Sequence, residues 1–434
     1  MSHPPTQPIR VAIVGGGIVG LAFAIALAKS GADVAVDIYE RAPAFVQAGA
    51  GIGFWPRIWE SVRALGLADA LRPFASCDVP ARYVRADQQA CVPLGQTPAA
   101  LQSFHRADLL AVLLQHLPTH YRTHFGARLV GYSDNAAGAV TLRFKDGTTT
   151  TCDLLVGADG IKSAVRTVMY EGLAMRADTD DAKDGFLKNV TPTWTGQYVY
   201  RGLIRTEDLA KAAPGHRALT EPVYFLGKDK YFMCYPISRG TIINCAALVS
   251  YPEGNGTVHA EPWVETVSQD ELRAHYAGWA PEVHALIDHI SAPSKWAINT
   301  VAALPTYTHN RTALIGDAAH AMTPHQASGA AQGIEDARVL AALLASPHAS
   351  RTALPRLLRA YDAARRAPSQ DVLRRSFETG AAYCFQRGAL AEGDGEAAFK
   401  AWKEAVGGLL AWTAVPGAQR EVDAAVERFE VEDV

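Results

Sequence analysis

The 434-residue sequence predicts an α/β fold in which a nucleotide-binding unit is interrupted by an antiparallel sheet and followed by C-terminal helices. Three observations support this prediction. Residues 10 to 40 read as a strand, a glycine-rich turn, a helix and a second strand. Between residues 197 and 250 the apolar pattern changes to a period of two, which is typical of antiparallel strands. From about residue 330 to the end the chain reads mainly as helices.

The opening unit carries the pattern Gly15-x-Gly17-x-x-Gly20 between the strand RVAIV and the helix LAFAIALAKSG. Gly15 permits a tight turn, Gly17 lets a pyrophosphate approach the backbone, and Gly20 allows the helix to pack closely on the strand. Glu40 ends the second strand, 20 residues after Gly20, where a carboxylate accepts hydrogen bonds from a ribose hydroxyl. The pattern predicts a Rossmann-like site for a dinucleotide with a free 2′-hydroxyl, which is FAD or NAD rather than NADP.

The following elements are read from the same periodicities. Helices are expected over residues 56 to 71 and 105 to 117. Residues 139 to 160 predict a hairpin with an Asp-Gly turn and then a buried strand. The antiparallel region comprises QYVYRGLI, PVYFLG, YFMCYPIS and TIINCAALVS. A helix is expected at SQDELRAHYAGW, and the strand TALIG leads into residues 316 to 337.

This order predicts that the first domain, the nucleotide-binding one, is discontinuous. It would comprise residues 1–72, 101–185 and 300–365. A sheet domain for the substrate would comprise residues 73–100 and 186–299, and residues 366–434 would form a C-terminal helical region.

Composition excludes several functional classes. The net charge is −3, so there is no electrostatic footprint for nucleic acid or an anionic membrane. The six cysteines contain no CxxC pair and read as reduced thiols of a cytoplasmic protein. The most apolar window, residues 11 to 28, is broken by glycines near its start, so a strand, turn and helix explain it better than a membrane span.

The stretch GDAAHAMTPHQASGAAQGIEDA, residues 316 to 337, holds His320 and His325 among small side chains. Their i, i+5 spacing is poor for two metal ligands on one helix face, and no third ligand cluster is evident, so no metal site is expected. No G-x-S-x-G elbow occurs, which argues against a hydrolase triad. We interpret His320 as structural.

Three further stretches, HRADLL, GADGIKSAVR and LIGDAAHAMTPHQASGAAQGIEDA, complete a motif set. Together with VAIVGGGIVGLAFAIALAKSG they resemble the motifs of single-component FAD-dependent aromatic hydroxylases, over about residues 8 to 380. Within that family the sequence looks most like the salicylate hydroxylases and their relatives, through APAFVQAGAGIGFWP, YRGLI and SFETG.

The resemblance implies an enzyme that hydroxylates a phenolic aromatic acid with O2 and NAD(P)H through a flavin C4a-hydroperoxide, with or without loss of CO2. FAD would be bound, and NADH or NADPH would visit as a transient co-substrate, since no second GxGxxG occurs. The residues implied in cofactor binding are Gly15, Gly17, Val19, Gly20, Glu40, Arg41, Arg106, Asp159, Asp317, Gly329 and Ala330.

Three of these positions have specific implied roles. Arg106 would reach the pyrophosphate or ribityl chain, and Asp159 would support the pyrophosphate region and the nicotinamide step. Asp317 would bind a ribityl hydroxyl, and the following helix would direct its N-terminal amides at the flavin pyrimidine. The alternatives are a surface ion pair between Arg106 and Asp108 and a plain helix cap at Asp317, and such a cap is compatible with a cofactor contact.

The resemblance places His325 beside the reacting edge of the flavin, where a neutral imidazole could take or relay a phenol proton. A hydrogen bond that only holds the loop is an equal alternative. The aromatic side chains Tyr224, Phe232 and Tyr235 could line a substrate pocket. They could equally be core or surface residues, because alternation does not say which face of a sheet is which.

Two departures from the salicylate hydroxylase pattern leave the substrate open. The resemblance places a basic carboxylate anchor just after INCAALVS, but no Lys or Arg occurs between Arg239 and Arg273. His259, Arg201 or a backbone donor could substitute. The stretch RRAPSQD, residues 365 to 371, also shifts a proline. The alternatives are a hydroxylase of hydroxybenzoate, hydroxynicotinate or a polyketide phenol, an NAD-dependent dehydrogenase, and a non-catalytic FAD-binding protein.

Overall fold

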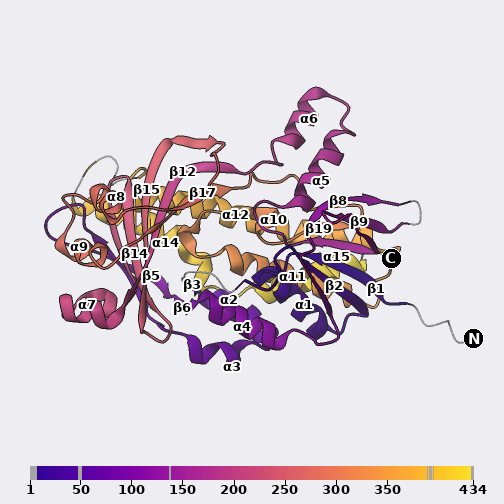
Figure 1. The fold of residues 1–434 in the computed structure, drawn as a ribbon, viewed down its shortest axis with the longest axis horizontal. Helices are drawn as coiled ribbons and strands as arrows, with labels where there is room; N and C mark the ends of the chain where they lie inside the picture. The colour runs from indigo at the N-terminus through magenta and orange to yellow at the C-terminus, as the bar shows by residue number, and fades with distance from the viewer. Residues whose placement is uncertain are drawn as a thin grey trace, which may run out of the picture.

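The computed structural model describes residues 7–46, 51–135, 138–388, 390, 393 and 395–431. Residues 47–50, part of the APAFVQAGAGIGFWP motif, lie outside the described residues. Figure 1 shows two main sheets on opposite sides of the molecule, with α10 (Asp317–His320) and α12 (Leu354–Tyr383) between them. The predicted combination of an α/β unit, an antiparallel sheet and C-terminal helices is confirmed.

The first sheet has six strands in the order β18-β19-β11-β1-β2-β7. All neighbouring pairs are parallel except β18 with β19. The strands are β1 (Ile9–Val14), β2 (Val34–Glu40), β7 (Arg122–Phe125), β11 (Leu154–Gly157), β18 (Thr308–His309) and β19 (Thr312–Leu314). Helix α1 (Ile18–Ser30) connects β1 to β2 and packs against α11 (Gly329–Leu344). Because β1, β2 and β11 run parallel, their carboxyl ends lie at one edge of the sheet.

The second sheet has eight strands in the order β16-β17-β12-β15-β14-β13-β4-β5, paired antiparallel apart from β13 with β4. The strands are β4 (Pro80–Arg85), β5 (Val92–Ala100), β12 (Thr193–Arg205), β13 (Val223–Gly227), β14 (Lys230–Ile237), β15 (Ile242–Thr257), β16 (Val264–Thr266) and β17 (Ser294–Thr300). β4 and β5 therefore join strands that come much later in the chain.

Smaller elements connect and cover these sheets. β3 (Gly51–Phe54) pairs with β6 (Gln102–His105), and β8 (Leu129–Asp134), β9 (Val140–Phe144) and β10 (Thr149–Cys152) form a third sheet. The remaining α-helices are α2 (Pro56–Ala64), α3 (Ala68–Leu71), α4 (Arg106–His116), α5 (Ala164–Ala174), α6 (Asp180–Leu187), α7 (Thr206–Ala212), α8 (Gln269–His275), α9 (Pro281–Ile287), α14 (Glu396–Leu410) and α15 (Ala418–Val431). The helix expected over residues 56 to 71 is divided into α2 and α3, because Gly66 adopts a left-handed φ of 73° between them.

The large sheet is buried on both faces. Phe232, Cys234 and Ile243 pack with α8 and α9 on one face. Tyr224 and Tyr231 pack on the other face with side chains from α12 and α14. Alternate residues of each strand therefore enter two separate cores, as the pleat requires.

The boundary expected at residue 366 falls inside α12, which is one continuous helix. Pro368 lies within it and cannot donate a backbone hydrogen bond to the preceding turn. Burial compensates for this loss, because Arg365, Ser369 and Val372 on the same stretch are buried. The C-terminal helices α14 and α15 pack against α12 and so extend the body of the protein. Among the described residues, no helix has both the length and the apolar character that a membrane crossing requires.

A buried charge network anchors the stretch 316–337 to α12. The Arg365 guanidinium donates to Asp336 Oδ1 at 2.8 Å and to Gln332 Oε1 at 2.8 Å. It also pairs with Glu335 and Glu421. The Asp336 carboxylate in turn accepts from the Gly316 backbone N–H at 3.0 Å. The network therefore holds both ends of the small-residue stretch.

We expect Arg365→Met to lower the free energy of unfolding by about 3–5 kcal/mol, because the buried Asp336 and Glu335 carboxylates lose the guanidinium that they share and are left with His320 and Arg57 as side-chain ion partners. The matched control is Arg366→Met. Arg366 is the next residue of α12, and its side chain is 38% exposed and pairs with Asp362. This variant should cost less than about 1 kcal/mol. Urea unfolding of the full chain measures both, and equal losses would contradict the assignment.

Candidate active site

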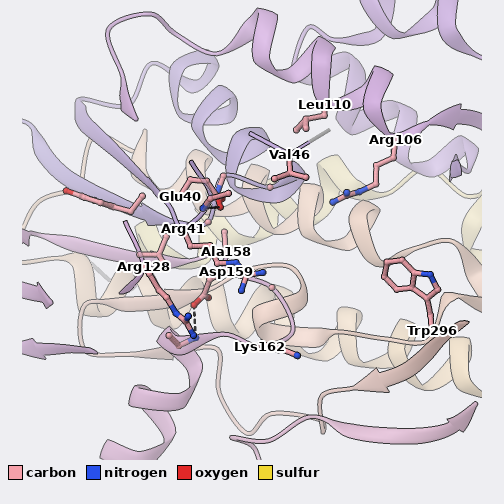
Figure 2. Close-up of a pocket in the computed structure, with 18 of the residues that line it drawn as sticks. Glu40, Arg41, Val46, Arg106, Leu110, Arg128, Ala158, Asp159, Lys162 and Trp296 are labelled. Atoms are coloured by element: carbon pink, nitrogen blue, oxygen red, sulfur yellow. Dashed lines mark hydrogen bonds between the residues drawn. The ribbon is translucent and has the colours of Figure 1, made fainter. Parts of the chain in front are cut away.

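A cavity of about 1200 Å³ lies between the two main sheets and is called the main cavity below (Figure 2). One wall comes from the carboxyl ends of β1, β2 and β11 and the residues that follow them. The opposite wall comes from β12, β15 and β17. In sheets with parallel strands, ligands bind at these carboxyl ends. The main cavity is therefore the candidate site.

The glycines of the opening unit differ in what an added Cβ atom would meet. Gly15 has a φ of 109°, and a Cβ there would lie 2.3 Å from the Ala158 carbonyl oxygen. A Cβ at Gly20 would lie 2.0 Å from the Gly15 carbonyl oxygen. A Cβ at Gly17 would meet no atom within 4 Å, so this backbone faces open space in the main cavity. The start of α1 has no side-chain cap, which leaves its amides available to an anion.

Glu40 and Arg41 line the same end of the main cavity. The Glu40 carboxylate accepts backbone N–H groups of Gly16 and Ala42, both at 2.8 Å. These bonds hold the carboxylate at the cavity wall and leave it lone pairs for hydroxyl donors. The expected position beside a ribose is thus geometrically available.

Asp159 and Arg106 line the main cavity from two further elements. Asp159 Oδ2 accepts the Ala164 N–H at 2.7 Å at the start of α5, and burial raises the pKa of this carboxyl. Arg106 is the first residue of α4, and its charge acts on both Asp317 and Arg201. Figure 2 shows Arg106 pointing toward the cavity at the end away from Glu40.

Asp317 lies exposed at the start of α10, beside the first turn of α11. The two elements are close, because a Cβ added at Gly329 would lie 3.7 Å from Asp317 Oδ1. Gly329 and Ala330 are half-buried, whereas the next ten residues of α11 are buried, and no side chain caps this helix. The surrounding protein raises the pKa of Asp317 through desolvation. An uncapped helix start and a carboxylate thus face the same open space.

Some predicted cofactor residues lie behind the main cavity and do not line it. Val19 packs against Gly316 and Gly333, where a Cβ would approach its side chain to 3.0 and 2.4 Å respectively. Gly20 sits at the junction of α1 and β1. Both residues set the spacing between the cofactor-binding helix and its neighbours.

His325 is buried, and both of its ring nitrogens make hydrogen bonds. Its Nε2 lies 3.0 Å from Gln197 Oε1, so Nε2 carries the proton, because an amide oxygen only accepts. Its Nδ1 lies 2.9 Å from the Tyr231 hydroxyl, which therefore donates to it. Burial lowers the pKa of the imidazole to about 3, so the ring is neutral at neutral pH.

The three aromatic residues predicted for the substrate do not share one wall. Tyr224 packs in a tyrosine cluster with Tyr83 and Tyr383, at ring distances of 5.5 and 4.9 Å. Tyr235 reaches the backbone of Gly51, which lines the main cavity. Phe232 instead points to the opposite face and packs on Tyr276 in the core under α8 and α9. For Phe232 the structure selects the core alternative, because a spacing of three residues in a regular strand puts it opposite Tyr235.

A profile of the FAD binding domain family matches residues 8–376. A salicylate hydroxylase of Pseudomonas putida is 38% identical over 388 residues, which cover 86% of each chain. A 3-amino-4-hydroxybenzoate 2-monooxygenase of Streptomyces platensis is 32% identical, over 88% of this chain and 90% of the relative. A solved salicylate hydroxylase substrate complex superposes with a TM-score of 0.83 and 32% identity, and the match covers 97% and 98% of the two chains. The chain belongs to the FAD-dependent aromatic hydroxylases.

The main cavity of this hydroxylase fits FAD, its cofactor, with NAD(P)H as co-substrate. The open backbone at Gly17 and the uncapped start of α1 suit a pyrophosphate. Glu40 suits the adenosine ribose. Asp317, Gly329 and Ala330 are not among the residues that line the main cavity, and they would meet the flavin end from beside it. The family match thus supports the expectation that these segments hold the cofactor, while each residue's contact remains a proposal.

His320 has a structural environment in the hydroxylase. It is fully buried, and its Nε2 lies 2.6 Å from Asp336 Oδ2 in the Arg365 network. Within the described ranges, no group of three His, Cys, Asp or Glu side chains could hold a metal ion.

Sequence reasoning did not select Gln197, Tyr231 or Trp296. Tyr231 could have been found, because period two places it on the same face as Tyr235. Gln197 lies 128 residues from His325, and no local signal joins them. Trp296 is exposed on β17 and contacts Arg201 across strands, which also requires the sheet pairing.

Proposed function

We propose that the hydroxylase acts on a hydroxybenzoate whose hydroxyl is next to the carboxylate, and that hydroxylation releases CO2, as for salicylate to catechol. One oxygen atom of O2 would enter the ring and the other would leave as water, with NAD(P)H supplying two electrons. Relatives named for salicylate and 6-methylsalicylate support this choice. Bound FAD would supply the chemistry that takes electrons from NAD(P)H and activates O2.

The observation that carries the proposal is the hydrogen-bonded chain from Gln197 through His325 to Tyr231. Because Gln197 keeps the proton on Nε2, the Nδ1 lone pair takes the Tyr231 O–H. The Tyr231 oxygen is then left to accept a hydrogen bond from a substrate phenol. This hydrogen bond would polarise the phenol O–H and raise the electron density of the ring, which hydroxylation requires. Burial keeps the imidazole neutral, so it offers a lone pair rather than a resident charge.

The tyrosine cluster around this chain would exclude water. Tyr83, Tyr224 and Tyr383 are buried, and Trp402 from α14 closes the cluster. The hydroxyls of Tyr83 and Tyr383 bond to each other at 3.0 Å, so they do not draw in solvent. A dry site suppresses wasteful peroxide release.

We also propose that the protein is cytoplasmic. The six free cysteines support this location, because free thiols are typical of reducing compartments.

A substrate screen tests this function. The FAD-loaded enzyme is incubated with 2-hydroxybenzoate, 4-hydroxybenzoate, 3-amino-4-hydroxybenzoate or 6-hydroxynicotinate, with NADH and then NADPH. NAD(P)H consumption, O2 uptake, CO2 and ring products are measured. We expect 2-hydroxybenzoate to give catechol and CO2 in equal amounts. Peroxide without catechol would refute the proposed decarboxylative hydroxylation. Coupled turnover of another acid would identify that acid as the substrate instead.

A further inference from the structure

Arg201 on β12 lines the main cavity together with Trp296 on β17. The central carbon of its guanidinium lies 4.8 Å from the centroid of the Trp296 ring. Figure 2 shows Trp296 and Arg106 at the end of the cavity away from Glu40 and Arg41. Arg201 therefore lies away from the pyrophosphate and ribose positions, at the end where the reacting rings would meet.

Arg201 has no anionic partner in the part of the chain that the structure describes. No carboxylate lies within ion-pair distance, and its guanidinium donates no hydrogen bond to a described residue. Two fully buried arginines are, in contrast, saturated. Arg166 donates to four backbone carbonyl groups, and Arg365 pairs with three carboxylates. Arg201 is half-buried and lines the main cavity, so its guanidinium donors are available to a ligand there.

The electrostatic surroundings of Arg201 favour an anion. Burial lowers the pKa of its guanidinium, and the nearby charge of Arg106 lowers it further. Tyr235 and Tyr231 act on this pKa in the opposite direction. Two cations at a cavity wall that is partly shielded from solvent attract a negative group more strongly than they would in water.

Other cations near this end of the protein are already engaged. Lys162 pairs with Glu261 and stacks on Trp263. Lys295 bonds Glu265 at 3.3 Å and Glu271 at 3.2 Å. The ring nitrogens of His259 contact Tyr198 and the Ala260 carbonyl oxygen. Because residues 240–272 contain no Lys or Arg, the strand end that follows β15 offers no substitute.

We propose that Arg201, whose guanidinium lies over the Trp296 ring, binds the carboxylate of the aromatic substrate and so sets the preference for acids over neutral phenols. This inference rests on the proposed function. The planar guanidinium presents a fork of N–H donors that matches a carboxylate, and the contact with the indole restricts its position. The carboxylate at Arg201 and the phenol at Tyr231 would then orient the ring by two separate contacts.

The test compares acids with their neutral amides. Binding of 2-hydroxybenzoate, 2-hydroxybenzamide, 4-hydroxybenzoate and 4-hydroxybenzamide is measured without turnover, by the change in flavin absorbance of the oxidised FAD-loaded enzyme. Arg201→Gln should raise the Kd of the acid by about 100-fold, because a desolvated charge pair is lost. The Kd of the matching amide should change by less than about 3-fold, since an amide carries no charge to lose. Arg201→Lys should fall between, because it keeps the charge without the fork.

Arg205→Gln is the matched control, since Arg205 ends the same strand and is 66% exposed in a surface pair with Glu207 and Asp208. It should leave all four Kd values unchanged. Equal weakening of acid and amide, or loss of FAD from Arg201→Gln, would overturn the anchor in favour of a cofactor or structural role. The two hypotheses fail separately. If the wild-type enzyme binds only 4-hydroxybenzoate and 4-hydroxybenzamide, the proposed substrate is refuted. If Arg201→Gln keeps the wild-type preference for acids over amides, the role of Arg201 as carboxylate anchor is refuted.

Discussion

Replacement of Asp317 by alanine should give a folded protein that purifies with little bound FAD. The carboxylate lies exposed beside the uncapped start of α11, where we propose that it accepts a ribityl hydroxyl. A hydrogen bond to a charged group contributes about 1.5–3 kcal/mol, so FAD affinity should fall roughly 10- to 100-fold. The measurements are the flavin-to-protein absorbance ratio and the Kd from titrating apoprotein with FAD.

Two variants separate this role from a structural one. Asp69→Ala removes an exposed carboxylate in the first turn of α3, away from the main cavity, and should retain full FAD. Asp317→Asn keeps an acceptor oxygen without the charge and should show an intermediate FAD affinity. Normal flavin content and turnover in Asp317→Ala would refute the assigned role. A large drop in thermal stability of the apoprotein combined with an unchanged Kd for FAD would show that the role of Asp317 is structural.

Replacement of His325 by alanine should retain FAD but uncouple NAD(P)H consumption from hydroxylation. The loss removes the acceptor of the Tyr231 proton, and proton transfer by a positioned group contributes about 100-fold or more to rate. NAD(P)H oxidation should continue and yield hydrogen peroxide in place of hydroxylated product. The measurement is the ratio of product to NAD(P)H consumed, with peroxide determined in parallel.

Tyr231→Phe provides the sharper companion to His325→Ala. It keeps the ring volume and removes only the hydroxyl that bonds His325 Nδ1, so coupling should fall while the fold is retained. His325→Ala alone also opens space beside Gly380 and leaves Gln197 without its donor, which lowers stability. Full coupling in both variants would restrict His325 to holding its loop, which is the alternative that the sequence left open.

Local sequence was sufficient where one segment contains all the interacting groups. The turn from β1 to α1 is an example, because the separations of Gly15, Gly17 and Gly20 dictate where a Cβ would collide and where the backbone stays open. The hairpin of β9 and β10 and the strands β12 to β15 likewise follow from turn chemistry and period two. In contrast, local sequence does not show that α12 continues through Pro368 and across the domain boundary expected at residue 366, because burial of one face of the helix stabilises it there.

The sequence by itself determined the dinucleotide-binding unit, the order of the elements and the membership of a family, since each depends on neighbours in the chain. Only the tertiary structure decided that Phe232 enters the core, that Gln197 orients His325, and that Arg201 stacks on Trp296. The physical reason is that strand alternation specifies opposite faces without saying which face meets the cavity. β12 pairs with β17, and His325 bonds to Tyr231 and Gln197, which lie 94 and 128 positions away in the sequence. These contacts exist only once the sheets have folded around the site.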